Sequence, residues 1–352
     1  MPFEPLFHGA LLFFCFSKTL TIGYFYIRGD TMRKTLKLML ALSLTAAPAL
    51  ADKYAGEFLS FGMGGRALGL GGAYVSIADD GFASYWNPAA TALSSHQMIF
   101  NHSSNFDGLL TYDALGYSRP LKNGGLGLVF VRLSITGIPY TNDALVDLNG
   151  NGVMDPGERL DYDLITEIQD AESALFLNYS RTYRKDIFWG ANLKIVNKSV
   201  GSNSAWGIGL DAGVLARLPH DLRLGLNLQD ITTTYLAWDT GEKEIIFPAA
   251  RLGLSWNPVL AGAKALTVSA GFDIRFEGRR TASQYYVGNL SADSHYGLEY
   301  LLKQRLALRL GSDLGRLAAG AGLVLGRFSF DYAYLGSQDL GNSTRLSASL
   351  NF

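Results

Sequence analysis

Twelve residues near the middle of the chain have the spacing of a calcium-binding loop. The segment Asp147–Glu158 reads DLNGNGVMDPGE and matches the pattern D-x-N-x-N-G-x5-E in full, with Gly152 at the sharp turn. A hard cation such as Ca²⁺ is bound by oxygen atoms, which this type of loop supplies at fixed intervals. The predicted ligands are the side chains of Asp147, Asn149, Asn151, Asp155 (directly or through water) and Glu158 and the backbone carbonyl of Val153.

This segment has two readings. Asn-Gly and Pro-Gly pairs also favour a plain acidic turn, which would bind no metal. Pro156 and the lack of clear helical patterns on either side argue against a switching helix pair. We therefore predict a calcium ion that stiffens an external loop, with the affinity of about 10⁻⁴–10⁻³ M that is usual for extracellular sites.

The sequence gives little support to an enzyme. After the first fifty residues, each histidine is isolated in sequence from a plausible nucleophile: His96, His102, His220 and His295. His102 precedes Ser103 and Ser104, but adjacent residues of a strand point to opposite faces. We predict no catalytic residue, although arrangements that form only in three dimensions are invisible at this stage.

The N-terminal part has the features of an export signal. Residues 32–51 have a basic start, an apolar centre and small residues at the end, as secretory signal peptides do. The apolar centre is too short for a membrane-spanning helix. We predict cleavage before Asp52. Because Met32 is the better start, we interpret residues 1–31 as an upstream extension that is not part of the protein.

Composition and charge restrict the class of the mature chain. The single cysteine, Cys15, lies in the upstream extension, so no disulfide framework is expected. The formal net charge of -1 gives no electrostatic case for binding nucleic acid. No run of about twenty apolar residues follows the first fifty, so no helical membrane anchor is expected.

Residues 96–352 repeat a strand of about ten residues with one apolar and one polar face. The C-terminal strand shows the pattern, because Leu346, Ala348, Leu350 and Phe352 alternate with Arg345, Ser347, Ser349 and Asn351. Such strands are the units of transmembrane β-barrels. We predict an all-β fold, an antiparallel transmembrane barrel of about fourteen strands.

Alternation alone does not say which solvent each face meets, so a soluble β-sandwich is the alternative. The connections alternate between tight turns and the long segments 135–169, 230–244 and 276–291, as in outer-membrane barrels with short periplasmic turns and long external loops. Aromatic residues also fall near strand ends, as at membrane interfaces: Trp189, Trp206, Trp238, Trp256, Tyr285, Tyr286 and Tyr334. We therefore predict a monomeric barrel in lipid, in the bacterial outer membrane.

The polar faces of these strands carry many charged side chains. In lipid each would cost about 2–4 kcal/mol at mid-membrane, so these side chains must face a wet or paired interior. We expect them to pair across the wall and to support a plug. They are Asp211, Arg217, Arg223, Asp273, Arg275, Arg305, Arg309, Asp331 and Arg345.

Residues 52–95 do not alternate and are rich in glycine. Glycine permits close backbone approach and positive φ angles. The segment Ser84–Asn87 before Pro88 reads as a turn or a helix stop. A phosphate-binding loop is a poor alternative, because no Gly-Lys-Ser/Thr follows. We predict that this segment is a plug folded into the barrel lumen.

Both ends of the mature chain carry motifs of a known family. The segments are Gly65–Ala73, Ala78–Asp80, Tyr85–Ala89, Phe330–Tyr334 and Asp339–Phe352. At these segments the chain resembles the PorV/PorQ-type branch of the FadL-like (OmpP1/FadL) outer-membrane proteins, while the middle matches only in pattern. The plug motif residues are Gly65, Arg66, Gly69, Gly71, Gly72, Asp79, Asp80, Asn87, Pro88 and Ala89.

The resemblance implies a fourteen-stranded barrel with an N-terminal plug, and two possible functions. PorV-type members act with type IX secretion machinery, carrying cargo to the surface or serving its attachment. The local match favours this non-enzymatic role, with secreted or translocon proteins as partners. FadL-type members instead admit hydrophobic molecules such as long-chain fatty acids. No ligand-binding residue set carries over to this chain.

Overall fold

The computed structural model describes residues 55–105, 108–259, 265–336 and 342–352. The upstream extension and signal peptide expected in residues 1–51 lie outside these residues, as does the expected start of the plug at residues 52–54. Within the described residues, no helix is long and apolar enough to cross a membrane. These residues belong to one compact unit, residues 51–352, which is described below.

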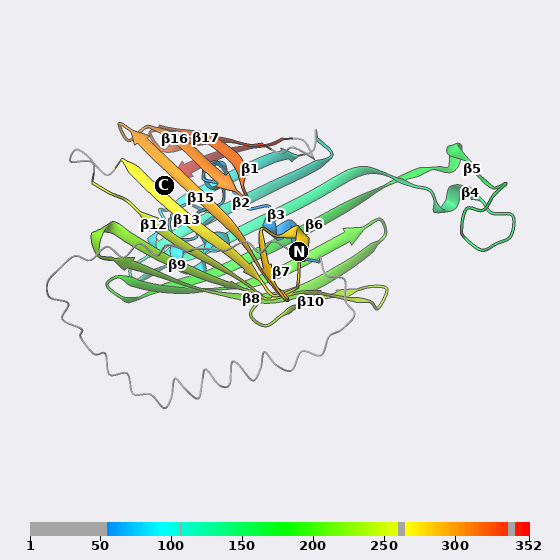
Figure 1. Cartoon of the computed structure of the whole chain (residues 1–352), viewed down its shortest axis with the longest axis horizontal. Coiled ribbons are helices and arrows are strands. Elements are labelled where there is room, and N and C mark those ends of the chain that lie inside the picture. The colour runs from blue at the N-terminus through cyan, green and yellow to red at the C-terminus, as the bar shows by residue number, and fades with distance from the viewer. Residues whose placement is uncertain (1–54, 106–107, 260–264, 337–341) are drawn as a thin grey trace, which may run out of the picture. The chain divides into compact units, whose positions relative to one another are not determined.

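Fourteen antiparallel strands form a closed barrel, as predicted (Figure 1). Each strand pairs with the next around the wall, and the last pairs with the first, β19 with β1. The strands are β1 (Gln97–Asn105), β2 (Leu110–Leu121), β3 (Gly124–Tyr140), β6 (Thr166–Arg184), β7 (Ile187–Val200), β8 (Asn203–Leu218), β9 (Leu222–Gln229), β12 (Ala249–Trp256), β13 (Leu266–Arg275), β15 (Leu290–Leu302), β16 (Leu306–Asp313), β17 (Arg316–Leu325), β18 (Phe328–Leu335) and β19 (Ser343–Asn351).

The outer face of the wall is apolar and the inner face is polar. On β19, Leu346 is 56% exposed while its neighbour Arg345 is only 3% exposed. In a soluble sandwich the apolar face would be buried and the charged face exposed. The reversed pattern excludes the sandwich and requires lipid around the barrel.

The two ends of the barrel differ in their connections. We call the end with the tight turns 122–123 and 185–186 the short-turn end, and the opposite end the long-loop end. At the long-loop end the wall carries three additional strands: β10 (Thr234–Trp238), β11 (Lys243–Ile246) and β14 (Tyr285–Val287). The expected loop 230–244 therefore contains strands, and the strand predicted at residues 245–257 begins only at Ala249.

The expected loop 135–169 begins and ends as an extension of the β3–β6 hairpin. After a bulge between Ile135 and Ile138, the two strands pair as far as Tyr140 and Thr166. The hairpin projects from the long-loop end (Figure 1). Its tip contains η4 (Asn142–Ala144), β4 (Leu145–Val146), β5 (Arg159–Leu160) and η5 (Tyr162–Leu164), of which β4 and β5 pair with each other.

Two predicted side-chain positions are wrong. Arg305 was expected on the inner face, but it lies exposed in the turn between β15 and β16. Trp238 was expected in an outer aromatic girdle. It is instead partly buried against the apolar core inside the barrel, with Lys198 Nζ 5.8 Å from its ring centroid.

Residues 55–95 fill the lumen as the predicted plug. Their helical turns are η1 (Glu57–Ser60), α2 (Gly65–Gly69), α3 (Ala83–Trp86) and η2 (Pro88–Leu93). Large side chains such as Leu70, Tyr74 and Phe82 are fully buried. The plug starts near the long-loop end, where Glu57 pairs with Arg275 of β13, and leads into β1 at the short-turn end.

Candidate functional site

The barrel wall is interrupted where β9 passes into β10. On one side β8 pairs with both strands, through residues 212–218 and 205–208. On the other side β9 pairs with β12 and β10 with β11, leaving residues 230–233 opposite only Phe247 and Pro248. Asp230 and Thr233 have φ angles of 51° and 57°, which are uncommon without glycine. We call this patch, residues 230–233 and 247–248, the wall break.

A buried ion cluster anchors the wall break from inside. Lys194 Nζ lies 2.6 Å from Asp230 Oδ1 and 3.4 Å from Asp211 Oδ1, and all three side chains are at most 5% exposed. The Asp230 N–H donates to Asp211 Oδ1 at 2.9 Å, and the Thr234 hydroxyl donates to Asp230 Oδ1 at 2.6 Å. The backbone of Asp230 in the wall break is therefore held by its ion pair with Lys194 and by its hydrogen bond to Asp211.

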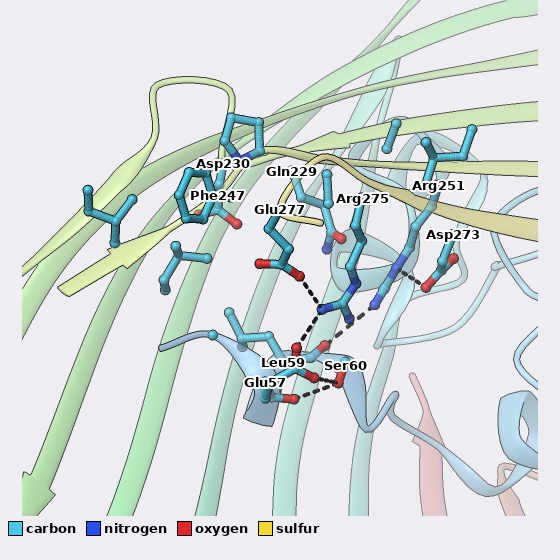
Figure 2. Close-up of a pocket in the computed structure, with 17 residues that line it drawn as sticks. Glu57, Leu59, Ser60, Gln229, Asp230, Phe247, Arg251, Asp273, Arg275 and Glu277 are labelled. Atoms are coloured by element: carbon cyan, nitrogen blue, oxygen red, sulfur yellow. Dashed lines mark hydrogen bonds and ion pairs between the residues drawn. The ribbon is translucent and has the colours of Figure 1, made fainter. Parts of the chain in front are cut away.

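A hollow lies between the wall break and the start of the plug, which we call the break hollow (Figure 2). It encloses about 590 Å³, part of which is open to solvent. One part of its lining is apolar and belongs to the wall: Ile245, Ile246, Phe247, Pro248 and Ala249. Another part is charged: Glu57, Arg251, Asp273, Arg275 and Glu277.

The charged residues of the break hollow are paired with one another. Figure 2 shows Arg275 between the plug and the wall, where its Nη1 lies 2.8 Å from Glu57 Oε1 and 3.3 Å from Glu277 Oε1. Arg251 Nε donates to Asp273 Oδ2 at 3.0 Å. Since these groups form ion pairs with one another, the accessible lining offers an apolar wall beside a network of paired charges.

Arg66 of α2 ties the plug to the wall toward the short-turn end. Its guanidinium donates to both carboxylate oxygens of Glu299, at 2.9 and 2.8 Å, and forms an ion pair with Asp79 at 2.6 Å. Glu299 also accepts from Arg309 at 2.6 Å, and Arg309 pairs with Asp331. Bidentate pairs of this kind fix geometry as well as charge, so Arg66 sets the position of α2.

Asp80 gives the docking of the plug a pH dependence. Its carboxylate accepts from the Tyr74 hydroxyl and from the Phe82 N–H, both at 2.9 Å. Burial, followed by the neighbouring Asp79 charge, raises the pKa of Asp80 from 3.8 to about 6. Between these pH values the folded chain holds a proton that the unfolded chain releases. The protonated Asp80 carboxyl therefore stabilises the docked plug fully below pH 3.8, and this contribution is lost as the pH rises to about 6.

Replacing Asp80 with Asn is expected to remove this dependence and to stabilise the docked plug at pH 7 by about 1–2 kcal/mol. Two pKa units correspond to about 3 kcal/mol, and the expectation is lower because Asp80 is only partly buried. Protease cleavage of the plug at pH 4.5 and pH 7 measures the effect. Asp186→Asn, in an exposed turn, should keep the pH dependence of the wild type. The same dependence in Asp80→Asn would contradict the assignment.

The glycines of the plug motif are where the plug meets the wall. The Gly65 N–H donates to Ser347 Oγ at 2.7 Å. A Cβ at Gly71 would lie 2.5 Å from the backbone of Ser312, so no side chain fits there. Gly69 and Gly72 approach the wall in the same way, at 3.1 Å from Gly320 and 3.0 Å from His295 for an added Cβ.

The Asn-Pro-Ala element of the plug is also structural. The Asn87 amide donates to the Val214 carbonyl of the wall at 3.1 Å, and its Oδ1 accepts from the Ala89 N–H at 3.0 Å. The Pro88 carbonyl accepts from Asn178 of β6 at 3.1 Å. The contact with Ala89 caps the N-terminus of η2. The helix α3 ends at Trp86 because Asn87, which precedes Pro88, is extended, and this confirms the predicted helix stop. All three motif residues are buried, so none of them faces a free ligand.

The predicted calcium loop lies at the tip of the β3–β6 hairpin and is exposed. Asp147 Oδ1 accepts from the N–H groups of Asn149 and Gly150, and its Oδ2 accepts from the Gly152 N–H at 2.7 Å. These bonds, that from Gly152 first, hold the pKa of Asp147 below its usual value. Gly152 has a φ angle of 73°, as its position in the turn requires.

The remaining predicted ligands bond to one another around the same turn. The amides of Asn149 and Asn151 both donate to Asp155 Oδ2 at 2.7 Å, and Glu158 accepts from the N–H groups of Leu148 and Asp155. In the part of the chain that the structure describes, no three His, Cys, Asp or Glu side chains form a metal-binding group. A calcium ion would have to replace several of these hydrogen bonds.

The histidines have partners other than nucleophiles. His102 Nδ1 lies 2.6 Å from Asp113 Oδ1, and both side chains are about half exposed. His295 donates from Nδ1 to the Gly71 carbonyl at 2.9 Å, which holds the plug against β15. His96 contacts the Tyr117 hydroxyl at 2.9 Å. These contacts are structural.

Comparison with known proteins gives matches in structure only. No family model matches the chain, and no curated protein matches it. The Pseudomonas putida toluene transporter TodX superposes with a TM-score of 0.56 at 12% identity, over 83% of this chain and 98% of that one. A Pseudomonas aeruginosa FadL homologue gives 0.51 at 13%, over 81% and 97%. The chain has the FadL-type fold.

The FadL-type fold accounts for the barrel but does not select between a transport role and a secretion role. A TodX mutant described as a monoaromatic hydrocarbon channel matches with a TM-score of 0.54 at 13% identity, over 83% of this chain and 99% of that one. None of these matches bears on the PorV/PorQ resemblance of the plug motif.

Sequence reasoning missed the residues that build the wall break. The alternation of apolar and polar residues places the side chains of Lys194 and Arg251 on the inner face of the wall. It does not identify the residues with which they pair. Asp230, the partner of Lys194, lies in the wall break. Tyr85, whose hydroxyl accepts from Arg251, belongs to the plug.

Proposed function

We propose that the protein is a passive channel for hydrophobic small molecules, with the break hollow as its binding region. The fold is that of the toluene transporter TodX and of a FadL homologue. The observation that carries the proposal is the position of an apolar lining at the patch where the wall lacks regular strand pairing. Phe247 and Pro248 lie in this patch, and Ile245 and Ile246 lie next to it at the end of β11.

The wall break offers an apolar molecule a route that the lumen does not. The lumen is filled by the plug and by ion pairs such as Arg66–Glu299, which an apolar molecule would have to separate. Closed strand ladders keep the backbone polar groups from lipid elsewhere in the wall. At the wall break, an apolar molecule in the break hollow faces the bilayer across side chains rather than across a strand ladder.

Filling the break hollow should block uptake. Ala249 lines it from β12, and Ala249→Trp is expected to slow uptake of toluene into proteoliposomes by about tenfold, the effect of about 1.4 kcal/mol on a barrier. Ala191→Trp, on the exposed outer face of β7, makes the same substitution outside the hollow and should leave uptake unchanged. Equal rates for both variants would argue against this route.

Secretion or surface attachment, the leading expectation from the sequence, is now the second candidate. It rests on the resemblance of Gly65–Ala73 and Ala78–Asp80 to PorV-type members, and the comparisons lend it no support. The motif glycines pack between plug and wall, where they are not available to a protein partner. Copurification of a secreted or translocon protein in near-equal amount would restore this candidate.

We also propose that the tip loop binds calcium as a structural ion. Glu158→Ala is expected to abolish calcium protection of residues 141–165 against protease, which in the wild type should develop at about 10⁻⁴–10⁻³ M calcium. Asp161→Asn, whose carboxylate caps η5 outside the six ligand positions, should keep the protection. Protease sensitivity that is the same with and without calcium in the wild type would refute the site.

A further inference from the structure

A second hollow lies inside the barrel, between the plug and the wall. It encloses about 360 Å³, including space open to solvent, and we call it the central hollow. Ser60, Arg251 and Asp273 line both hollows, so Arg251 stands where they meet. Arg345 of β19 reaches the central hollow from another part of the wall.

The two arginines are buried and hold the plug by its carbonyl groups. Each is 3% exposed. Arg345 donates from Nη1 and Nη2 to the carbonyls of Gly62 and Phe61, and Arg251 donates from Nη2 to the Leu59 carbonyl at 3.5 Å. Each guanidinium also lies on aromatic rings, Arg345 at 5.6 Å from the centroid of Tyr112 and Arg251 at 5.1 Å from that of Tyr85.

The charge of Arg345 is not neutralised by the protein. Among the described residues, the two carboxylates that line the central hollow are already paired. Asp273 pairs with Arg251 at 3.0 Å, and Asp313 pairs with Arg316 at 2.5 Å and lies 3.1 Å from His295 Nδ1. Arg345 has carbonyl acceptors but no carboxylate within ion-pair distance in the described part of the chain. A buried charge without a counter-ion is costly, so a negative group is favoured beside it.

Each arginine also keeps donor capacity without a partner. Within the described residues, Arg251 Nη1 and Arg345 Nε are buried and make no hydrogen bond. Two guanidinium groups line this hollow and keep unused donors, and one of them, Arg345, has no carboxylate partner among the described residues. Groups of this kind are the ones that carboxylates and other small anions bind.

We propose that the central hollow binds one negatively charged group of carboxylate or halide size, which serves as counter-ion to Arg345 and locks the plug to the wall. The group bridges Arg251 on β12 and Arg345 on β19. It thereby keeps both guanidinium groups directed at the plug carbonyls of residues 59–62. Loss of the anion leaves Arg345 without a counter-ion and weakens its hold on the plug carbonyls.

The first test is a crystal of the full mature chain soaked in sodium bromide. An anomalous bromide peak between the Arg251 and Arg345 guanidinium groups is expected. A hollow that contains ordered water only, or bromide only at the protein surface, would overturn the proposal.

The second test measures protease cleavage of the plug in detergent, in a buffer whose only anion is a bulky sulfonate. Acetate or chloride at ten times its dissociation constant is expected to slow cleavage by about tenfold. Arg345→Met should lose this response, and Arg132→Met, on the exposed outer face of β3, should keep it. If Arg345→Met does not fold, Arg345→Lys keeps the charge but loses the Nε donor, and should need about tenfold more anion.

Two sources of the negative group are distinguished by the ligands used. Protection by acetate or chloride identifies a free small anion, whereas protection by octanoate alone identifies the head group of a longer passenger molecule. No protection by any of the three, or equal protection in Arg345→Met, would refute the site. Since the readout is plug cleavage, this outcome is independent of whether toluene uptake occurs.

Discussion

Replacing Lys194 with methionine is expected to lower the free energy of unfolding by about 3–5 kcal/mol, the usual cost of breaking a buried ion pair by removing one partner. Lys194 is fully buried and is the cation beside two buried carboxylates, Asp211 and Asp230. Without it, the two carboxylates face each other at the wall break. Urea unfolding in lipid vesicles measures the loss as a lower midpoint at an unchanged slope.

Two further variants isolate the cause of that loss. Lys243→Met makes the same change at an exposed position of β11 and should alter stability by about 0.5 kcal/mol or less. The triple variant Lys194→Met, Asp211→Asn, Asp230→Asn removes the charges together and should recover most of the loss. Equal stability of the wild type and Lys194→Met would show that the cluster does not hold the wall break.

The second large effect is expected from Arg66→Met, which should weaken docking of the plug by about 2–3 kcal/mol. The side chain of Arg66 is 24% exposed, and Glu299 keeps its pair with Arg309 in the variant. The cost is therefore lower than for Lys194. Protease cleavage within residues 55–95 should accelerate by about 30-fold to 150-fold when cleavage follows the population of the open form.

Arg316→Met is the matched control for this prediction. Arg316 also pairs with a carboxylate, Asp313, but its side chain is 44% exposed at the end of a strand. Exposed pairs contribute about 1 kcal/mol or less. If the two variants release the plug equally, the buried pair between Arg66 and Glu299 is not what positions α2.

The strands of the wall follow closely from the sequence because lipid and lumen impose opposite demands on alternate residues. On β19, Arg345 must face inward and Leu346 must face outward, so a period of two is visible without any knowledge of pairing. The plug was recognised by glycines such as Gly71, whose lack of a side chain lets the plug backbone touch the wall.

The wall break was not predictable on the same grounds. Asp230 and Thr233 adopt positive φ angles without being glycine, because the Lys194 cluster fixes Asp230 from a strand far away in sequence. The pairing of Arg251 with Asp273 depends on the register between β12 and β13, which alternation does not determine. The geometry of the wall break therefore depends on tertiary contacts, whereas the strands of the wall follow from the local sequence pattern.

The tip loop differs from the wall break, because its local sequence alone predicts a function, the binding of calcium. The spacing from Asp147 to Glu158 is complete, and Gly152 turns as expected. Its side chains bond to backbone N–H groups and to each other in the described structure. The calcium titration in the protease assay is therefore the direct test of that loop.

Passage of a hydrophobic molecule by way of the break hollow can be tested by purifying the protein from native outer membranes in mild detergent and identifying the bound molecules by mass spectrometry. We expect a stoichiometric apolar small molecule that is retained by Ala191→Trp and lost from Ala249→Trp. A secreted or translocon protein in near-equal amount, with no apolar molecule bound, would contradict it.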